Sequence, residues 1–399
     1  MSTQTTFIEP LDVLFLRGNK LFGDPGSYGE SLVPPWPSVA AGALRSRMLA
    51  DERVDLAAFA RGEVDHPTLG TPKRPGSFAV TAFHLARRFA DGRVELLIAP
   101  PADLVISESE GKVSSVRSLQ PTVLASGLEA SSPLPRLPVL AEEQRSKPAG
   151  GYWLTQAGWE KYLKGEKPAA DDLLKASQLW AIDHRVGVGL DAHTRRAADG
   201  KLFSVQAVSM VQPRHEIAKR RVMKDDKQHQ EPILADYAVG FLASVSCASL
   251  PKDGSLRLGG DGRAAALHPC DAPPPTADHA AIAAARRCRI VLSTPGIFAD
   301  GWRLPGVDAQ GRFALGGVRG KLVCAAVPRF EAISGWDLAS REPKTAQRVA
   351  PAGSVYWLDE LDATPDALGK LAAAGLWDKA CEDAARRAEG FNRLSLAYW

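Results

Sequence analysis

A glycine-rich segment near the N-terminus combines positive charge with a position that suits anion binding. The segment RGNKLFGDPGSYGES contains Arg17 and Lys20 and lies between an expected strand and an expected helix. A helix N-terminus presents free backbone N–H groups that can bind phosphate. The segment lacks the G-K-[ST] ending of a Walker A loop and the G-x-G-x-x-G spacing of a dinucleotide site. It can therefore be interpreted as a phosphate-binding loop or, on this motif alone, more simply as a surface loop.

Two later segments also combine glycine with arginine. RVGVGLDAHTRRAADG contains Arg185 and Arg195, and LRLGGDGRAAAL places Gly259 and Gly260 shortly before Arg263. Guanidinium groups bind phosphate oxygens well, and glycine lets a backbone come close to a sugar-phosphate chain. Both segments could also be ordinary exposed turns. On the residues alone, both interpretations stay open for each segment.

The histidines offer little support for catalysis. Eight are present, but neither H-E-x-x-H nor the H-x-E and C-x-x-C deaminase pattern occurs. His184 and His193 lie near basic residues, so a general-base role in RNA cleavage is conceivable. A histidine beside an arginine is more often structural or a phosphate contact. We predict no catalytic residue, no metal site, no cofactor and no small-molecule substrate.

The overall composition limits the function classes. Of 399 residues, 45% are hydrophobic and 24% charged, and the net charge of +3 requires any RNA site to be a local patch. The five cysteines show no C-x-x-C spacing, which is typical of free thiols in a reducing cytosol. No apolar run approaches the roughly 18 residues of a membrane helix. We therefore expect a cytoplasmic protein without a membrane partner.

Expected strands and helices alternate in two similar sets. Asp91-Gly92 is a strong hairpin signal between two strands, and Ser38 is placed to cap a helix over 38–52. A turn is expected at 198–200. Further strands are expected at 7–16, 78–86, 93–99 and 237–246, with a long loop at 120–151 and helices within 152–165, 171–178 and 365–374.

This element order predicts an α+β fold of two ferredoxin-like (RRM-like) units with antiparallel sheets and long loop or helical insertions. The expected division is an N-terminal unit at 1–211, a charged mobile excursion at 212–232 and a C-terminal unit at 233–399. The excursion, PRHEIAKRRVMKDDKQHQEP, is rich in both charge signs and poor in apolar residues. It predicts an exposed segment, or alternatively a hairpin that RNA or a partner subunit orders. Asp225 and Asp226 lie within it, which is a poor setting for a preorganised metal site.

Several segments, taken in order, resemble a known family. IEPLDVLFLRGNKLFG and PPWPSVAAGALRSRML resemble the start of the third subunit of the Cmr complex, a RAMP-superfamily protein of type III-B CRISPR systems. RVGVGLDAHTRRAADGKLF, LRLGGDGR, AISGWDLASREPKTAQRVAPAGSVYWL and EGFNRLSLAYW follow in matching order. The sequence departs from the family pattern at Gly18, where many members have aspartate, and at Asn392, where a second glycine is more common.

The resemblance implies a non-catalytic subunit that holds the repeat-derived 5′ handle of the crRNA. The implied protein partners are the large polymerase-cyclase subunit and the backbone subunits of the complex. Phosphate contacts are expected from Arg17, Lys20, Arg45, Arg185, Arg195 and Arg263, with Gly259 and Gly260 allowing close approach and Ser38 donating at the helix start. Two rival hypotheses stay open. One is a metal-independent endoribonuclease that processes precursor crRNA, and the other is a subunit that contacts only proteins.

Overall fold

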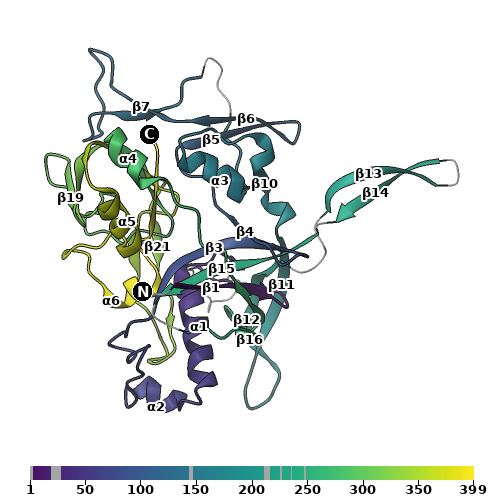
Figure 1. The fold of residues 1–399 in the computed structure, drawn as a ribbon. Coiled ribbons are helices and arrows are strands. Elements are labelled where there is room, and N and C mark those ends of the chain that lie inside the picture. Colours follow the sequence, from purple (N-terminus) through teal and green to yellow (C-terminus); the bar gives the residue numbers. More distant parts are fainter. Residues whose placement is uncertain are drawn as a thin grey trace.

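A computed structural model describes residues 3–18, 28–142, 147–210, 216–224, 227–234, 236–246 and 249–399. Two antiparallel sheets form its centre, and the C-terminal part, green to yellow in Figure 1, packs beside the first sheet. Lys20 and Cys247 lie outside the described residues.

The first sheet has six strands. In order across the sheet they are β16 (Ser255–Arg257), β17 (Ala264–Cys270), β1 (Thr3–Pro10), β15 (Tyr237–Ser246), β3 (Ala79–Phe89) and β4 (Val94–Leu97). All of these pairings are antiparallel, and β1 pairs with β17 on one side and β15 on the other. The predicted hairpin around Asp91-Gly92 is confirmed by the β3–β4 pair.

Helix α1 (Pro37–Asp51) connects β1 to β3 and packs against β3. Its buried residues recur at three- and four-residue spacing, so they form one face. They are Pro37, Ala40, Ala41, Ala43, Leu44, Met48 and Leu49. The prediction that Ser38 caps this helix is wrong. The N-cap is Trp36, and Pro37 takes the first helical position, where its missing N–H removes no helical hydrogen bond.

The second sheet has five strands. In order they are β19 (Arg312–Leu315), β20 (Val318–Ala326), β25 (Val355–Asp362), β18 (Cys288–Leu292) and β26 (Leu394–Ala397). Helices α5 (Pro365–Ala374) and α6 (Ala384–Glu389) connect β25 to β26. Helix α4 (His279–Ala285) precedes β18 and packs against α5. The expected helix at 365–374 is therefore confirmed.

The two sheets share one internal strand order. Numbering β1, β3, β15 and β17 as first to fourth gives the spatial order fourth, first, third, second. Numbered in the same way and read from the β26 edge, strands β18, β20, β25 and β26 give the same order. In the first set a helix lies in the first connection, as α1, whereas in the second set helices lie in the last connection, as α5 and α6. The prediction of an α+β fold with mainly antiparallel sheets is confirmed.

The chain leaves the first sheet and enters the second sheet after β17. The predicted domain boundary lay earlier, between residues 232 and 233. Strands β15, β16 and β17 come after that boundary, yet they pair within the first sheet. Strands β15 and β17 satisfy both edges of β1, which would otherwise lack hydrogen-bond partners, and β16 pairs with β17. On this pairing, the second sheet begins with β18.

An insertion between β4 and the next long strand packs onto the second sheet. It contains β5 (Leu104–Ser109), β6 (Lys112–Ser118), β7 (Gln120–Thr122), β8 (Leu137–Val139), β9 (Tyr152–Leu154), α3 (Gln156–Leu163), η1 (Ala170–Asp172), β10 (Leu173–Lys175) and η2 (Ala176–Gln178). The predicted helix at 171–178 is wrong, because residues 173–175 pair with β9 instead. The loop expected at 120–151 includes the short β7–β8 pair.

A buried ion pair joins this insertion to the second sheet. The Arg289 guanidinium on β18 donates to Asp103 at 2.7 Å and to the backbone carbonyl of Tyr162 at 3.0 Å. The Tyr162 hydroxyl donates to the other Asp103 oxygen at 2.8 Å. All three side chains are buried, and burial raises the pKa of Tyr162 well above its ordinary value. A buried charge is tolerated when it is paired and hydrogen-bonded, as this one is.

Two long hairpins extend away from the sheets. One consists of β11 (Ala181–Leu190) and β12 (Ala197–Ser209), and β2 (Tyr28–Gly29) pairs in parallel with β12. Its turn lies at 191–196, not at the predicted 198–200, because the Asp191 carboxylate accepts hydrogen bonds from the backbone of His193 and Thr194. The expected turn residues continue β12 instead.

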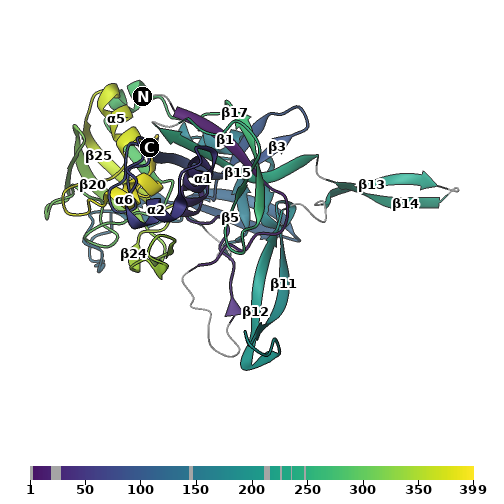
Figure 2. The ribbon, with the colours of Figure 1, turned by 90° about the horizontal axis from the view of Figure 1, so that it is seen from below.

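The other hairpin consists of β13 (Glu216–Lys224) and β14 (Lys227–Leu234). Figures 1 and 2 both show it extending from the body of the molecule, in a different direction from β11–β12. The segment predicted as a charged excursion therefore forms a hairpin over its described residues. Asp225 and Asp226 lie outside the described residues.

A smaller hairpin leaves the second sheet between β20 and β25. It contains β21 (Glu331–Ile333), β22 (Trp336–Asp337), β23 (Glu342–Pro343) and β24 (Gln347–Val349). A short helix, α2 (Leu56–Arg61), follows α1. Among the described residues, no helix is both long and apolar enough to cross a bilayer.

The first sheet should become less stable in mild acid because of His84 on β3. Burial lowers the pKa of His84 from 6.5 to about 4, so the unfolded chain binds this proton more readily than the folded chain. The free energy of unfolding should fall as the pH decreases from 6.5 towards 4. Urea unfolding at pH 7 and pH 5 measures this fall, and His84→Gln should reduce it. His193→Gln, in an exposed turn, serves as the control; equal pH dependence in both variants would contradict the assignment to His84.

Candidate nucleic-acid interface

Two arginines predicted to contact phosphate meet at one buried aromatic ring. The guanidinium carbon of Arg263 lies 5.1 Å from the centre of the Phe15 ring, and that of Arg185 lies 5.9 Å from it. Arg185 comes from β11, Arg263 from the turn before β17, and Phe15 from the segment after β1. The Phe15 side chain is buried against Val205 and Ala207 of β12. We call Phe15, Arg185 and Arg263 the Phe15 cluster.

Each arginine of the cluster has a carboxylate partner. Arg263 Nη1 donates to Asp12 Oδ2 at 2.7 Å, and Arg185 Nε donates to Asp183 at 2.9 Å. The backbone N–H of Val13 lowers the pKa of Asp12, and Arg263 and Arg185 lower it further. All four charged side chains are partly exposed. The cluster is therefore a surface feature in which the positive charges are already balanced.

The glycine pair beside the cluster makes contact within the chain. The backbone N–H of Gly260 donates to the carbonyl of Phe15 at 2.8 Å. Gly259 has a φ of +73°, and a Cβ added there would lie 2.8 Å from the same carbonyl oxygen. Glycine at 259 thus allows the turn to approach Phe15. The predicted role of Gly259 and Gly260 in RNA approach stays a prediction, and of the two only Gly259 is required to be glycine by this internal contact.

Arg17 and Arg195 lie in different parts of the structure. Arg17 is two residues after Phe15 and forms a β-bridge with Ser31. The Ser31 hydroxyl in turn donates to the carbonyl of Gln206 on β12 at 2.7 Å. Arg195, with a φ of +55°, belongs to the turn at the far end of β11–β12. The first loop thus meets β12 near the cluster, whereas Arg195 lies at the hairpin tip.

Arg45 and Ser38 belong to a different region, on α1. Arg45 stacks on Phe78, with its guanidinium carbon 5.0 Å from the ring centre, and burial lowers its pKa. Helix α1 also contacts α6 of the C-terminal part. Ser38 is half-buried within the first turn of the helix. The structure does not bring either residue to Phe15, because α1 lies against β3.

The two candidate general bases are separated on the β11–β12 hairpin. His184 stacks on Tyr28, with ring centres 6.4 Å apart and 19° between planes. His193 lies in the turn, where its backbone N–H donates to Asp191. In the part of the chain that the structure describes, no group of three His, Cys, Asp or Glu residues is arranged to hold a metal ion. The two histidines therefore do not form one catalytic site.

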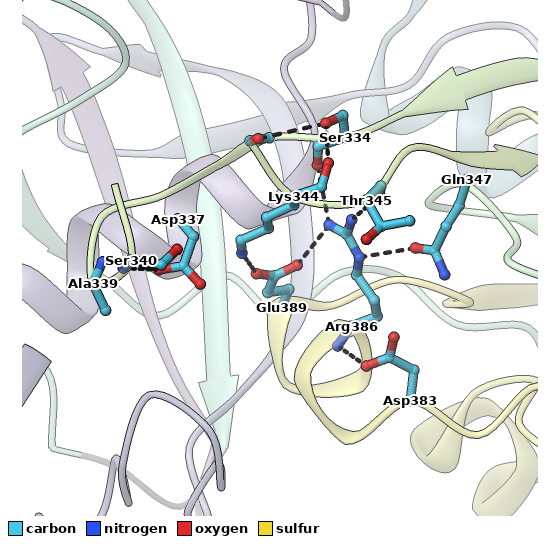
Figure 3. A network of polar contacts seen from close by, with 11 residues as sticks. Ser334, Asp337, Ala339, Ser340, Lys344, Thr345, Gln347, Asp383, Arg386 and Glu389 are labelled. Carbon is cyan, nitrogen blue, oxygen red and sulfur yellow. Dashed lines mark hydrogen bonds and ion pairs between the residues drawn. The ribbon is translucent and has the colours of Figure 1, made fainter. Parts of the chain in front are cut away.

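A dense polar network in the C-terminal part has a structural role (Figure 3). Arg386 and Glu389 on α6 are buried and form an ion pair at 3.1 Å. Arg386 also donates to the carbonyl of Ser334 at 3.2 Å and to Gln347 at 3.1 Å, and Lys344 pairs with Glu389. These contacts attach the β21–β24 hairpin to α6. Because both buried charges have several partners, the network stabilises this attachment.

Asn392, the departure from the family's glycine pattern, is also explained by its contacts. It has a φ of +58°, a conformation that asparagine tolerates better than most residues. Its buried side chain accepts from the backbone N–H of Ile297 at 2.6 Å and donates to the carbonyl of Leu376 at 2.7 Å. Asparagine therefore keeps the glycine-like backbone while adding hydrogen bonds.

Two members of this site, Phe15 and Asp12, carry no clear signal in the sequence. Phe15 lies in an apolar run that predicts a strand, which gives no sign that arginines pack on its ring. Asp12 is one of 46 acidic residues, and only the pairing of the chain near Phe15 with Gly260 brings it to Arg263.

Replacing Gly259 with alanine should destabilise the Phe15 cluster. The variant must move the turn away from the Phe15 carbonyl in addition to adopting a positive φ, so we expect a loss of about 2 kcal/mol in the free energy of unfolding. Gly262→Ala is the matched control, since Gly262 has a φ of +61° but its added Cβ comes no closer than 3.6 Å to a neighbour. Urea unfolding of both variants makes the comparison; an equal loss would rule out the close approach as the cause.

Comparisons with known proteins place the chain in a family. A family model described as CRISPR-associated protein (Cas_Cmr3) matches residues 6–399. Similar solved structures include a chain of the type III-B Cmr-beta bound to cognate target RNA and AMPPnP, at 13% identity and a TM-score of 0.41, and a chain of Cmr-beta bound to cognate target RNA, at 13% and 0.40. Each alignment covers 88% of this chain and 86% of the other. No curated protein sequence matches. Because the family model spans nearly the whole chain, the protein belongs to the Cmr3 family of CRISPR-associated proteins, as its sequence resemblance predicted.

Proposed function

We propose that this chain is a non-catalytic subunit of a cytoplasmic type III-B CRISPR ribonucleoprotein and binds the repeat-derived 5′ handle of the crRNA. The observation that carries the proposal is the meeting of Arg185 and Arg263 at Phe15. These residues come from two of the three glycine-arginine segments, and the third segment reaches β12 nearby through Ser31. Separate parts of the chain therefore contribute to one surface.

The fold is consistent with this role. Each sheet has the strand order fourth, first, third, second with antiparallel neighbours, which supports an interpretation as two ferredoxin-like (RRM-like) units. Each unit retains one of its two usual helical connections. Proteins with such sheets commonly bind single-stranded RNA, but fold alone does not establish function. The charged surface at Phe15 is therefore the stronger support.

The chemistry of the cluster suits an RNA backbone. A guanidinium can donate two parallel hydrogen bonds to one phosphate, and the Phe15 ring restricts how far each arginine can move. The net charge of +3 is too small to attract RNA to the whole surface. Contacts with phosphate would therefore be concentrated where arginines gather.

Docking to protein partners is the second part of the proposal. The face of β11–β12 opposite Arg185 carries exposed apolar side chains, namely Val186, Val188, Leu190 and Leu202. Exposed apolar patches commonly mark interaction sites. The partners implied by the family are the large polymerase-cyclase subunit and the backbone subunits of the Cmr complex. We propose that one of these neighbours covers this face.

The endoribonuclease alternative has less support. RNA cleavage without a metal needs a base and an acid close to one phosphate. His184 stacks on Tyr28, and His193 lies in the turn beyond the far end of β11. Neither is hydrogen-bonded to a residue that would orient it as a base in the described part of the chain.

Charge reversal in the Phe15 cluster should weaken RNA binding. Arg185→Glu and Arg263→Glu each remove a phosphate donor and add repulsion, so we expect on the order of tenfold weaker binding and a smaller salt dependence. The measurement is the amount of short RNA that copurifies with the tagged protein from its host, followed by titration at low and high salt. Arg312→Glu, on β19, is the control. Full RNA retention in both cluster variants would exclude the cluster from the interface.

Removing the histidines should leave RNA processing unchanged. His184→Ala and His193→Ala are expected to give crRNA with the same 5′ end and the same amount as the unaltered protein, because neither is placed as a general base. Sequencing the ends of copurified RNA tests this. Accumulation of unprocessed precursor in either variant would favour the endoribonuclease instead.

A further inference from the structure

The Phe15 cluster presents a physical problem for RNA binding, because its positive charges are already neutralised. Arg263 pairs with Asp12 at 2.7 Å and Arg185 pairs with Asp183 at 2.9 Å. Two arginines and two aspartates sum to no net charge. A phosphate approaching this surface would meet the aspartates as well as the arginines, so the carboxylates must influence the affinity.

The two aspartates are placed differently. Asp183 lies on the same strand as Arg185, two residues away, and their side chains pair along β11. Asp12 comes from another segment and is influenced electrostatically by both Arg263 and Arg185. Asp12 is thus the carboxylate that interacts with both arginines, as a phosphate bound between them would do.

Arg263 also has a donor that the free chain does not use. Its Nε–H is buried and has no hydrogen-bond partner among the described residues, although its Nη1 is bonded to Asp12. Buried donors are nearly always satisfied, so one that is not indicates a missing acceptor. A phosphate oxygen that binds two donors of the same guanidinium could supply this acceptor after a small rotation of the side chain.

We propose that Asp12 occupies a phosphate site in the RNA-free chain and is displaced from Arg263 when RNA binds. This inference rests on the proposed RNA-binding function and names the residue that sets the affinity of that site. The Asp12 carboxylate holds the Arg263 guanidinium over Phe15 until a phosphate replaces it. RNA then gains the arginine contacts but loses part of that gain in breaking the ion pair.

The Asp12–Arg263 ion pair is exposed enough for phosphate to replace the carboxylate. The Asp12 side chain is 55% exposed and that of Arg263 is 28% exposed. Ion pairs at such positions contribute little to stability, so their disruption is not a large barrier. The carboxylate can turn into solvent while Phe15 keeps the arginine in place. Protonation is not needed, because the pKa of Asp12 is lowered and the group stays ionised at neutral pH.

The decisive variant is Asp12→Asn. It keeps the shape of the side chain but removes the charge that competes with phosphate, so RNA should bind about three- to tenfold more tightly. The gain should be larger at low salt, because it is electrostatic. The probe is a labelled single-stranded RNA with the 5′ end found in the copurified RNA, titrated against the full-length chain or its assembly. Asp308→Asn is the control, since Asp308 pairs with Arg312 at 2.7 Å, an ion pair outside the cluster.

A double-mutant cycle links the gain to Arg263. In an Arg263→Gln background, Asp12→Asn should increase affinity clearly less, because the arginine that it releases is absent and only the weaker electrostatic effect on Arg185 and phosphate remains. Urea unfolding of each variant checks that the fold is retained. Unchanged or weaker binding by Asp12→Asn, in a protein whose Arg263→Glu variant loses RNA, would overturn the role of Asp12 alone. If the unaltered chain and every variant fail to bind RNA, the proposed function itself fails.

Discussion

The pairing of the N-terminal segment with distant parts of the chain is the constraint on which the rest of the structure depends. Strand β1 lies inside the first sheet, between β15 and β17, so its hydrogen bonds can be made only with residues beyond position 236. The chain then continues past Pro10 and forms bridges from Leu14 to Val208 and from Phe15 to Gly260. These bridges bring the three glycine-arginine segments to one surface.

The second sheet and its attachments stabilise this arrangement from the other side. The Asp103–Arg289 pair joins the insertion to β18. Arg386 and Glu389 of α6 hold the β21–β24 hairpin through contacts with the Ser334 carbonyl, Gln347 and Lys344 (Figure 3). A buried polar network of this kind can contribute no more to the free energy of unfolding than an apolar core would. It nevertheless fixes the relative positions of the segments that it joins. Both networks lie beside clusters of buried apolar residues, so each attachment is held in one geometry.

In the proposed RNA site, the Phe15 cluster would combine binding with restraint of the arginines. Arginine over an aromatic ring is positioned before the ligand arrives, which reduces the entropy lost on binding. A carboxylate that satisfies the same arginine avoids an unpaired charge in the free protein, and it lowers the affinity for anions. The balance between these effects, rather than the total positive charge, would decide how firmly the surface holds RNA.

The sequence by itself determined the element types and the chemistry of the segments. Alternating apolar residues and the Asp91-Gly92 turn predicted β3 and β4, and the glycine-arginine segments indicated Arg185 and Arg263. Local rules failed where several were in conflict, as at Ser38, where the preceding Trp-Pro took the cap, and at residues 171–178, where pairing with β9 outweighed helix propensity. Only the tertiary structure decided that Phe15 and Asp12 join the arginines while Arg45 packs elsewhere. The physical reason is that side chains more than 200 residues apart meet through strand pairing, which depends on the whole sheet and leaves no local pattern in the sequence.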